Sequence, residues 1–136
     1  MFQKQIAVQA PRRGLHPITS AIQEVVDQSQ IHRGLCHIFV QHTSVSLLIQ
    51  ENADPSARAD LEMFFDKLAL QYASLFKHTA EGPDDMPSHI KSALTQTSLT
   101  IPLQDGQLAL GTWQGIYLWE HRNHTPARRL WVTVQG

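Results

Sequence analysis

The sequence predicts an α+β fold: a compact, sandwich-like domain of mainly antiparallel β-sheets with two or three helices. Segments rich in β-branched and aliphatic residues gather toward both ends of the chain, and one long helical pattern interrupts them. A doubly wound parallel sheet would need regular alternation of strands and helices, which this sequence lacks. The 136 residues contain no internal repeat and no linker, so we expect one domain over residues 1–136.

The first third of the chain predicts several strands and a short helix. Residues 2–8 alternate apolar and polar side chains, as a strand with one buried face does. Residues 15–18 continue extended, and Thr19 is then expected to cap a helix. The apolar side chains that would share one face of this helix are Ile22, Val25 and Val26. Further strands are expected at 35–40 and 45–49, where aliphatic and β-branched residues predominate.

The dipeptide Asp54-Pro55 predicts the start of a long helix, because Asp caps free amides and Pro at the first helical position loses no hydrogen bond. We expect this helix to end near Ala69. Its buried stripe is predicted to be Leu61, Phe64, Phe65 and Leu68.

The last third predicts one more helix, over 87–94, and then strands. A hairpin is indicated by apolar runs at 98–103 and 107–110 on either side of Gln104-Asp105-Gly106. Two final strands are expected at 115–120 and 129–134, which brings the total to about eight strands.

Charge and composition exclude several classes of protein. The net charge is −1 with no basic tract, which argues against a nucleic-acid or membrane-surface partner. No apolar run approaches the length of a membrane span. The one cysteine, Cys36, lies in an apolar strand and has no internal disulfide partner, so we expect a cytoplasmic protein with an inert core thiol. Low surface charge in so small a chain also favours a buried subunit interface.

The most informative run lies between two histidines, His78 and His89. It contains Glu81, Asp84 and Asp85 and is stiffened by prolines. Imidazole beside carboxylate suits zinc and other borderline metals, as well as acid–base chemistry. The eleven-residue spacing matches no compact zinc motif, and a solvent-exposed acidic turn is the alternative.

A third histidine, His42, ends an apolar strand and opens a Thr-Ser turn. It is either a rim residue, which with His78 and His89 would form a three-histidine zinc site, or a turn residue that caps backbone groups. Three other histidines have no carboxylate or second histidine nearby in the sequence, and we expect them to be structural or at the surface: His16, His32 and His37.

A strand-to-helix corner carries a second group of oxygen ligands, Glu51, Asn52 and Asp54. Carboxylates and amides suit Mg²⁺, and the free amides of a helix start suit phosphate. The alternative is that Asp54 acts as a helix cap alone.

Two further segments carry candidate substrate contacts. In Gly111-Thr112-Trp113-Gln114-Gly115, Trp113 offers a face for stacking a heteroaromatic ring and Gln114 can recognise ring nitrogens, although packing explains a lone aromatic equally well. Glu120 and Arg129 belong to a polar cluster near the C-terminus. Arginine there could bind phosphate, or it could pair with Glu120 across a subunit boundary. No nucleophile elbow, phosphate loop or dinucleotide-binding glycine motif is present.

Three motifs in this order resemble the YjbQ family (UPF0047), in particular its bacterial branch. They are Gln41-His42-Thr43-Ser44-Val45-Ser46-Leu47 with Glu51-Asn52-x-Asp54-Pro55, the run from Glu81 to Lys91, and the run from Gly111 to Arg122. The resemblance covers essentially the whole chain. It implies a sandwich-like α+β fold, assembly as a homotrimer with a site shared between subunits, and a secondary thiamine-phosphate synthase activity. That reaction joins hydroxymethylpyrimidine diphosphate to thiazole phosphate and releases pyrophosphate.

The resemblance also implies roles for particular residues. The implied catalytic residues are His78, His89, Glu81, Asp85 and Asp54. The implied substrate contacts are Asn52, Trp113, Gln114, Glu120 and Arg129. Departure of pyrophosphate calls for a divalent metal, which could be Mg²⁺ held by Glu51, Asp54, Glu81 and Asp85. The alternative assignment places Zn²⁺ on His42, His78 and His89. We therefore expect a transferase acting on a small phosphorylated heteroaromatic substrate; the alternative is a zinc-dependent hydrolase or a protein that binds phosphorylated metabolites.

Overall fold

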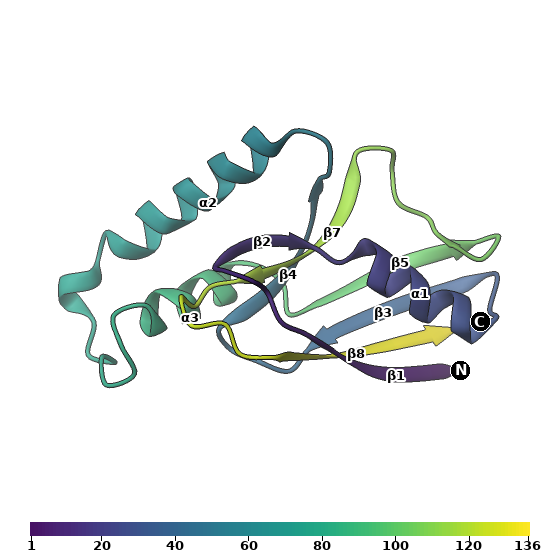
Figure 1. Cartoon of the computed structure of the whole chain (residues 1–136), viewed down its shortest axis with the longest axis horizontal. Coiled ribbons are helices and arrows are strands. Elements are labelled where there is room, and N and C mark those ends of the chain that lie inside the picture. Colours follow the sequence, from purple (N-terminus) through teal and green to yellow (C-terminus); the bar gives the residue numbers. More distant parts are fainter.

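Two antiparallel sheets and three α-helices make up the computed structural model, which describes residues 1–136 (Figure 1). The larger sheet has the order β1-β8-β3-β5-β6, and the smaller has the order β2-β7-β4. The strands are β1 (Phe2–Val8), β2 (Gly14–Pro17), β3 (Gly34–Val40), β4 (Val45–Glu51), β5 (Ser98–Gln104), β6 (Gln107–Leu108), β7 (Gln114–Glu120) and β8 (Arg128–Gln135). The helices are α1 (Thr19–Ser29), α2 (Pro55–Leu70) and α3 (Asp85–Leu94), with a 3₁₀ turn at Ala73–Leu75. The predicted fold class is confirmed.

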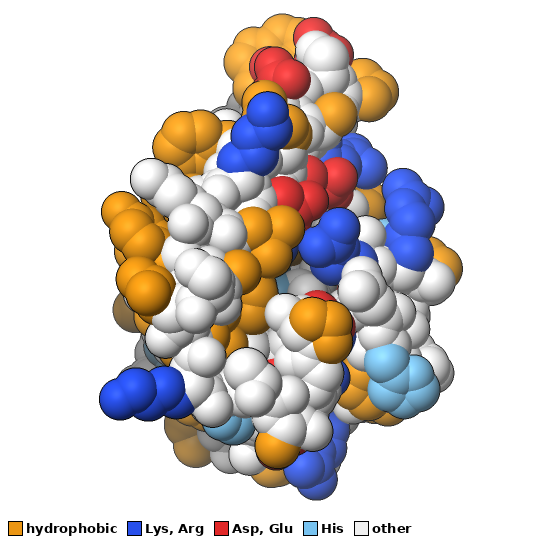
Figure 2. Space-filling model, turned by 90° about the vertical axis from the view of Figure 1, so that its left-hand side faces the viewer, with side chains coloured by type: hydrophobic (Ala, Val, Ile, Leu, Met, Phe, Trp, Pro, Cys, Tyr) orange, Lys and Arg blue, Asp and Glu red, His pale blue; other side chains and the backbone are white.

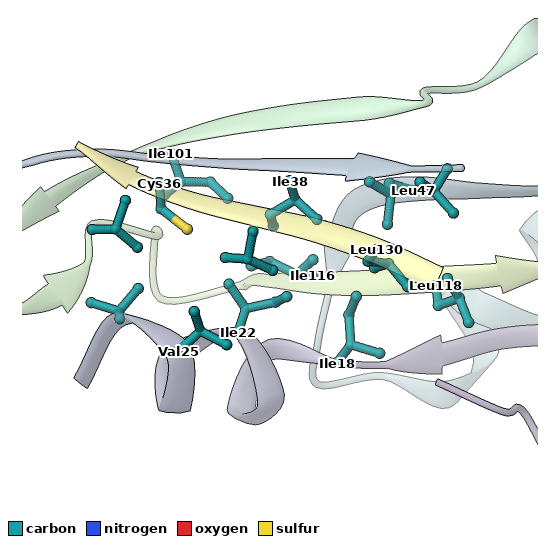
Figure 3. Packing of buried hydrophobic residues seen from close by; sticks show 14 of the residues in the cluster. Ile18, Ile22, Val25, Cys36, Ile38, Leu47, Ile101, Ile116, Leu118 and Leu130 are labelled. Carbon is teal, nitrogen blue, oxygen red and sulfur yellow. The ribbon is translucent and has the colours of Figure 1, made fainter. Parts of the chain in front are cut away.

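The hydrophobic core lies between the larger sheet on one side and α1 with the smaller sheet on the other (Figures 1 and 3). Alternate residues of β3 and β8 point inward, as the period of two requires. Ile22 of α1, Ile38 of β3 and Leu118 of β7 are fully buried in this one cluster. The three elements come from distant parts of the chain, so the core unites both halves of the sequence.

The first helix begins at Thr19, as predicted, but Thr19 does not cap it. The capping position falls on Ile18, which makes no side-chain cap bond. The Thr19 hydroxyl instead accepts a hydrogen bond from the Ile116 amide over 2.9 Å. This contact joins the start of α1 to β7, so the position was predicted correctly and the role was not.

The predicted hairpin forms around Asp105 and Gly106, whose φ angles of 52° and 77° are typical of a tight hairpin turn. Its second strand is shorter than expected, because β6 ends at Leu108. The chain then leaves the ladder, and the Leu110 amide donates to the Leu108 carbonyl over 2.8 Å.

The long helix α2 begins where predicted, and Asp54 caps it by accepting the Ser56 amide over 2.9 Å. The prediction for its buried stripe was wrong: Phe64 is 57% exposed, the other three predicted residues are only partly buried, and Ala69 is the one buried residue of the helix. Leu61 and Phe65 pack only on a small satellite cluster around Trp119. The physical reason is that α2 projects from the body of the molecule, so the rest of the chain covers only a narrow edge of this helix (Figure 1).

Helix α3 begins at Asp85, two residues before the predicted start. Pro87 is tolerated there because the first turn of a helix needs no intrahelical amide donors. Asp85 therefore lies in a helix and is only 2% exposed, which contradicts the alternative of a solvent-exposed acidic turn at this residue. None of the helices combines the length and apolar character that crossing a membrane would need.

Candidate functional site

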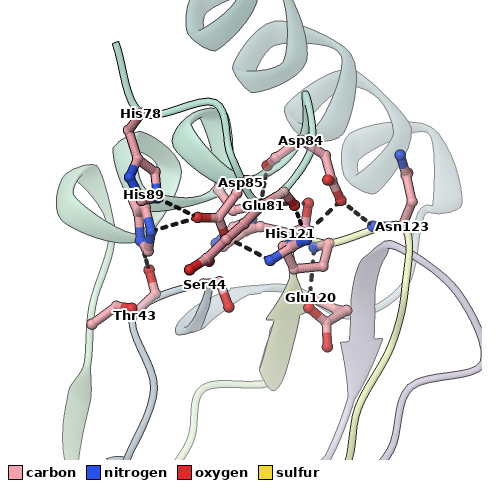
Figure 4. A network of polar contacts seen from close by, with 12 residues as sticks. Thr43, Ser44, His78, Glu81, Asp84, Asp85, His89, Glu120, His121 and Asn123 are labelled. Carbon is pink, nitrogen blue, oxygen red and sulfur yellow. Dashed lines mark hydrogen bonds and ion pairs between the residues drawn. The ribbon is translucent and has the colours of Figure 1, made fainter. Parts of the chain in front are cut away.

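Three potential metal ligands converge at the start of α3: His78, Asp85 and His89 (Figure 4). The Oδ2 atom of Asp85 lies 2.7 Å from Nε2 of His78 and 3.0 Å from Nε2 of His89. Asp85 and His89 are four residues apart and so share one face of the helix. His78 reaches the same point from the loop before α3, and all three ligand atoms lie within 4.8 Å of one another.

The orientation of His89 is set from behind by the backbone. Its Nδ1 lies 2.9 Å from the carbonyl oxygen of Thr43, and a carbonyl can only accept, so Nδ1 carries a proton. In the neutral ring, Nε2 then presents a lone pair to the Asp85 carboxylate. Two acceptors at 3.0 Å repel each other unless a cation, either a proton or a metal ion, lies between them. A backbone carbonyl behind the ring is also the usual support for a metal-binding histidine.

Asp85 is held as a carboxylate despite its burial. Burial acts to raise its pKa, but the hydrogen bond from His78 and the positive charges of His89 and Arg122 outweigh it, so the pKa lies below its ordinary value. The Oδ1 atom accepts from Nη1 of Arg122 over 2.6 Å, which leaves Oδ2 for the two imidazoles. The carboxylate therefore presents one face to an arginine and the other to two histidines.

Arg122, directly after β7, is clamped by three groups. Its Nε donates to Oδ2 of Asp84 over 3.1 Å, its Nη1 donates to Asp85, and its Nη2 donates to the Glu81 carbonyl over 2.9 Å. The Asn123 amide also donates to Asp84 over 2.8 Å. Burial acts to raise the pKa of Asp84, but its hydrogen bonds to Asn123 and Arg122 and the arginine charge lower it. Glu81 thus contributes its backbone carbonyl to this network; the residue is exposed, and a side-chain hydrogen bond with Glu81 is a further, smaller cause that lowers the pKa of Asp85.

Glu120 does not lie at the surface where a substrate could reach it. Its side chain is 0% exposed and forms a two-pronged ion pair with Arg128, with distances of 2.7 and 2.6 Å. Glu120 also accepts the Arg122 amide over 3.1 Å. The predicted substrate contact is therefore a buried support for Arg122, and its arginine partner belongs to the same chain rather than to a second subunit.

His42 lies near the pair of histidines but outside the group of three ligands. Its Nε2 accepts the Arg129 amide over 2.8 Å, which uses the atom that would otherwise bind a metal. Burial and the charges of Arg128 and Arg129 lower its pKa, so it is predominantly neutral at pH 7. An open hollow of about 370 Å³ runs between His42 and His89. The structure thus brings together two of the three predicted zinc-binding histidines.

The remaining predicted site residues lie at the opposite end of the smaller sheet. Gln114 begins β7 and Glu120 ends it, six residues away, which is roughly 20 Å at the rise of a strand. Glu51 pairs in register with Gln114, so the strand-to-helix corner lies at this far end. The amide of Asn52 holds the turn by donating to the Thr112 and Gln114 carbonyls, over 3.2 and 3.3 Å.

At this far end, Trp113 is exposed and its ring is free to stack, whereas the Gln114 side chain accepts the Gly111 amide over 2.7 Å. Asp54 is occupied by its capping bonds, which lower its pKa. Within one chain, the proposed Mg²⁺ ligands are divided between the two ends of the sheet, with Glu51 and Asp54 at one end and Glu81 and Asp85 at the other.

The donor set at α3 fits a borderline metal such as zinc. Two imidazole nitrogens and one carboxylate oxygen with space left for a fourth ligand are the composition of catalytic zinc sites. The same groups can also exchange protons. Sequence reasoning identified all three but did not assign roles to Arg122 and Thr43. The only sequence signal for Arg122 was its place in the polar run Glu120-His121-Arg122, and no side-chain signal could reveal the Thr43 carbonyl.

Comparison with known proteins places this chain in a family. Residues 4–136 match the family model described as UPF0047 protein YjbQ-like. The chain is 48% identical over 134 residues to a UPF0047 protein of Synechocystis sp., covering 98% of this chain and 91% of that relative. It is 44% identical over 136 residues to the UPF0047 protein YjbQ of Salmonella typhimurium, covering 99% of this chain and 98% of that one.

Solved structures agree. A conserved hypothetical protein of Thermus thermophilus superimposes with a TM-score of 0.85 at 32% identity, covering 97% of this chain and 99% of its own. A hypothetical protein of Aeropyrum pernix gives a TM-score of 0.88 at 25% identity, covering 100% and 99%. The match over nearly the full length, at both sequence and fold level, shows that this chain belongs to the YjbQ-like family, UPF0047.

Proposed function

We propose that this protein is a metal-dependent enzyme acting on a small phosphorylated heteroaromatic substrate. The reaction we put first is the joining of hydroxymethylpyrimidine diphosphate to thiazole phosphate with release of pyrophosphate. One observation carries the proposal: His89 turns its Nε2 toward the Asp85 carboxylate, 3.0 Å away and beside a second imidazole, and this group of donors suits a metal ion. The free, buried Cys36 is compatible with a cytoplasmic enzyme.

The roles of the residues follow from their contacts. His78, Asp85 and His89 would hold the metal, which when bound supplies positive charge to the departing diphosphate. Arg122 keeps Asp85 ionised and oriented, so it acts as a positioning residue. In the reaction the bond from the pyrimidine methylene carbon to the diphosphate oxygen breaks, its electron pair leaves with pyrophosphate, and the thiazole nitrogen forms the new carbon–nitrogen bond. His78, whose side chain is about half exposed, lies at the entrance of the site.

We further propose that the complete site is shared between subunits of a homotrimer. Trp113 and Asn52 lie too far from His89 to act on the same small molecule within one chain. If the Trp113 end of one copy packed against the histidine end of its neighbour, the exposed Trp113 and the open pair His78 and His89 would together form one site. The exposed apolar side chains of α2, such as Phe64, support burial in such an assembly.

The direct test is incubation of the purified protein with the two thiamine precursors, with Mg²⁺ or Zn²⁺ present, and detection of thiamine phosphate. We expect product with wild type and with His124→Ala, an exposed histidine away from the site, and none with His89→Ala. No product above background from wild type, or equal product from His89→Ala, would contradict the synthase assignment.

A second candidate is supported by the same ligand composition. Two histidines and one carboxylate around a metal with an open position also suit activation of water for hydrolysis. Release of inorganic phosphate from phosphomonoesters by the zinc-loaded protein, without thiamine phosphate formation, would favour this hydrolase. Thermal stabilisation by phosphorylated pyrimidines or thiazoles without turnover would favour a binding protein.

A further inference from the structure

The open hollow between His42 and His89 has the size and the lining of a small-molecule subsite. Its volume of about 370 Å³ is within the range of sites that bind small ligands. Its residues come from the loop between β3 and β4, from α3 and from the chain directly after α3: His42, Thr43, His89, Ser92, Ala93 and Thr97. No carboxylate is among them, so nothing in the lining repels a negatively charged ligand.

His42 has a free N–H donor whose position is fixed by the backbone. Its Nε2 lies 2.8 Å from the backbone amide of Arg129, and an amide nitrogen can only donate, so Nε2 carries no proton. The single proton of the neutral ring is therefore on Nδ1. The buried side-chain nitrogens without a partner belong to Arg58 and His121, so the unpaired Nδ1 of His42 is open to solvent. His42 can thus donate to a ligand in the hollow.

Two hydroxyl groups of the lining add to this donor. The side chains of Thr43 and Thr97 form no hydrogen bond within the chain, so both hydroxyls are free to donate to a ligand. The third hydroxyl, that of Ser92, is already engaged, because it donates to the Val45 carbonyl over 3.2 Å. The hollow therefore offers one fixed donor and two rotatable ones.

The electrostatic environment of His42 favours an anionic ligand. Burial is the largest cause that lowers the pKa of His42; the positive charges of Arg128 and Arg129 lower it further, and the negative charge of Glu120 opposes them. Arg128 is paired with Glu120, whereas Arg129 is exposed and forms no ion pair. In the lower half of Figure 2, which shows the end of the molecule that carries α3, the charged side chains in view are mainly basic.

We propose that this hollow binds the phosphate group of a small molecule and that the Nδ1–H of His42 donates a hydrogen bond to one of the phosphate oxygens. His42 is then a substrate contact and not a metal ligand. A free phosphate ion would leave most of the hollow empty, so the phosphate belongs to a larger molecule.

The identity of that molecule rests on the proposed function, under which it is thiazole phosphate. His89 belongs both to the hollow and to the group of three metal ligands, so a molecule in the hollow lies beside the proposed metal. The metal would bind the diphosphate of the pyrimidine substrate. The phosphate of the thiazole substrate then needs donors of its own, and the hollow supplies them.

The test is a titration of the purified protein with thiazole phosphate alone, in the presence of zinc, followed by ¹⁵N NMR of the histidine side chains. Without the pyrimidine substrate no reaction consumes the ligand, so the titration measures binding. We expect the His42 resonances, identified by their loss in His42→Gln, to show a protonated Nδ1 and an unprotonated Nε2. The Nδ1–H resonance should shift saturably with thiazole phosphate and should not shift with the thiazole alcohol, which lacks the phosphate.

Two substitutions separate the donor of His42 from its support of the fold. In His42→Gln the side-chain oxygen can still accept the Arg129 amide, but no donor remains at the position of Nδ1. The affinity for thiazole phosphate should therefore fall about tenfold. His42→Asn places an amide donor near the position of Nδ1 and should retain more of the affinity. His124→Gln, at an exposed histidine outside the hollow, should bind as wild type does.

The proposal is overturned if Nδ1 of His42 is unprotonated, or if its resonance does not respond to millimolar thiazole phosphate. Equal affinity of His42→Gln and His124→Gln, or equal affinity of wild type for inorganic phosphate and thiazole phosphate, would also overturn it. These results are independent of the synthase assay. A protein that fails the titration but forms thiamine phosphate would lack this subsite and keep the proposed function, and a protein that passes it without forming product would keep the subsite and lose the synthase assignment.

Discussion

Nη1 of Arg122 donates to Oδ1 of Asp85 over 2.6 Å, and this ion pair fastens the end of β7 to the first turn of α3. Asp85 is almost fully buried, so its charge depends on this partner and on the two imidazoles. The pair therefore links the stability of the fold to the chemistry of the candidate site.

Arg122→Met should lower the free energy of unfolding by about 3 kcal/mol, because it leaves a buried carboxylate with weaker compensation. Arg33→Met, at an exposed arginine without side-chain hydrogen bonds, should change it by less than about 0.5 kcal/mol. Urea unfolding measures both. Equal stability of the two variants would show that Asp85 does not depend on Arg122.

The purified protein should bind zinc stoichiometrically, and His89→Ala and Asp85→Asn should not. His124→Ala should retain the metal. Elemental analysis after dialysis against trace zinc measures the zinc-to-protein ratio of each variant directly. Retention of the metal by His89→Ala would place the metal elsewhere, and absence of metal from wild type would favour proton transfer by the same three residues.

Arg128 and Arg129 are adjacent, but their substitutions should have very different effects on the free energy of unfolding. Arg128→Met leaves the fully buried Glu120 without its ion-pair partner and should lower the free energy of unfolding by about 3–5 kcal/mol. Arg129→Met changes an exposed side chain and should lower the free energy of unfolding by less than about 0.5 kcal/mol. As a proposed phosphate contact, Arg129 should instead affect the affinity for phosphate-containing substrates, which this variant should bind more weakly. Chemical denaturation and substrate titration separate the two effects. A similar loss of stability in both would contradict the buried pair.

His121 should make the protein sensitive to acid. Its pKa is about 3 in the folded state and near the ordinary value of 6.5 when unfolded. Between these values the unfolded chain binds the proton and the folded chain does not, so stability falls as the pH drops from 6.5 toward 3. The slope is at most about 1.4 kcal/mol per pH unit. Urea unfolding of His121→Gln should lose this slope, whereas His124→Gln should keep it; an unchanged slope in His121→Gln would refute the assignment.

The proposed shared site predicts complementation between subunits. Trp113→Ala and His89→Ala should each be inactive alone, and mixed trimers should regain activity, because some interfaces then combine an intact Trp113 with an intact His89. The solution mass should be three times the 15.3 kDa of one chain. A monomer by light scattering, or mixtures without recovered activity, would exclude a site built in this way.

Most elements were predictable from the sequence because their signals are local. Alternation in residues 2–8 and the Asp54-Pro55 cap depend on neighbouring residues alone, and both were confirmed. The exception on α2 is informative: the periodicity shows which side chains share a face, but it does not show whether the same chain covers that face. Phe64 is exposed for this reason.

The sequence by itself determined the fold class, the family, and the residue types available for chemistry around His78 and His89. Tertiary structure decided which of these residues meet. It placed Asp85 against both histidines, removed His42 from the group through its bond to the Arg129 amide, and buried Glu120 with Arg128. It also carried Asn52 and Trp113 to the far end of the sheet. The physical reason is that strand register and helix packing set distances between residues remote in sequence, and no local pattern encodes them.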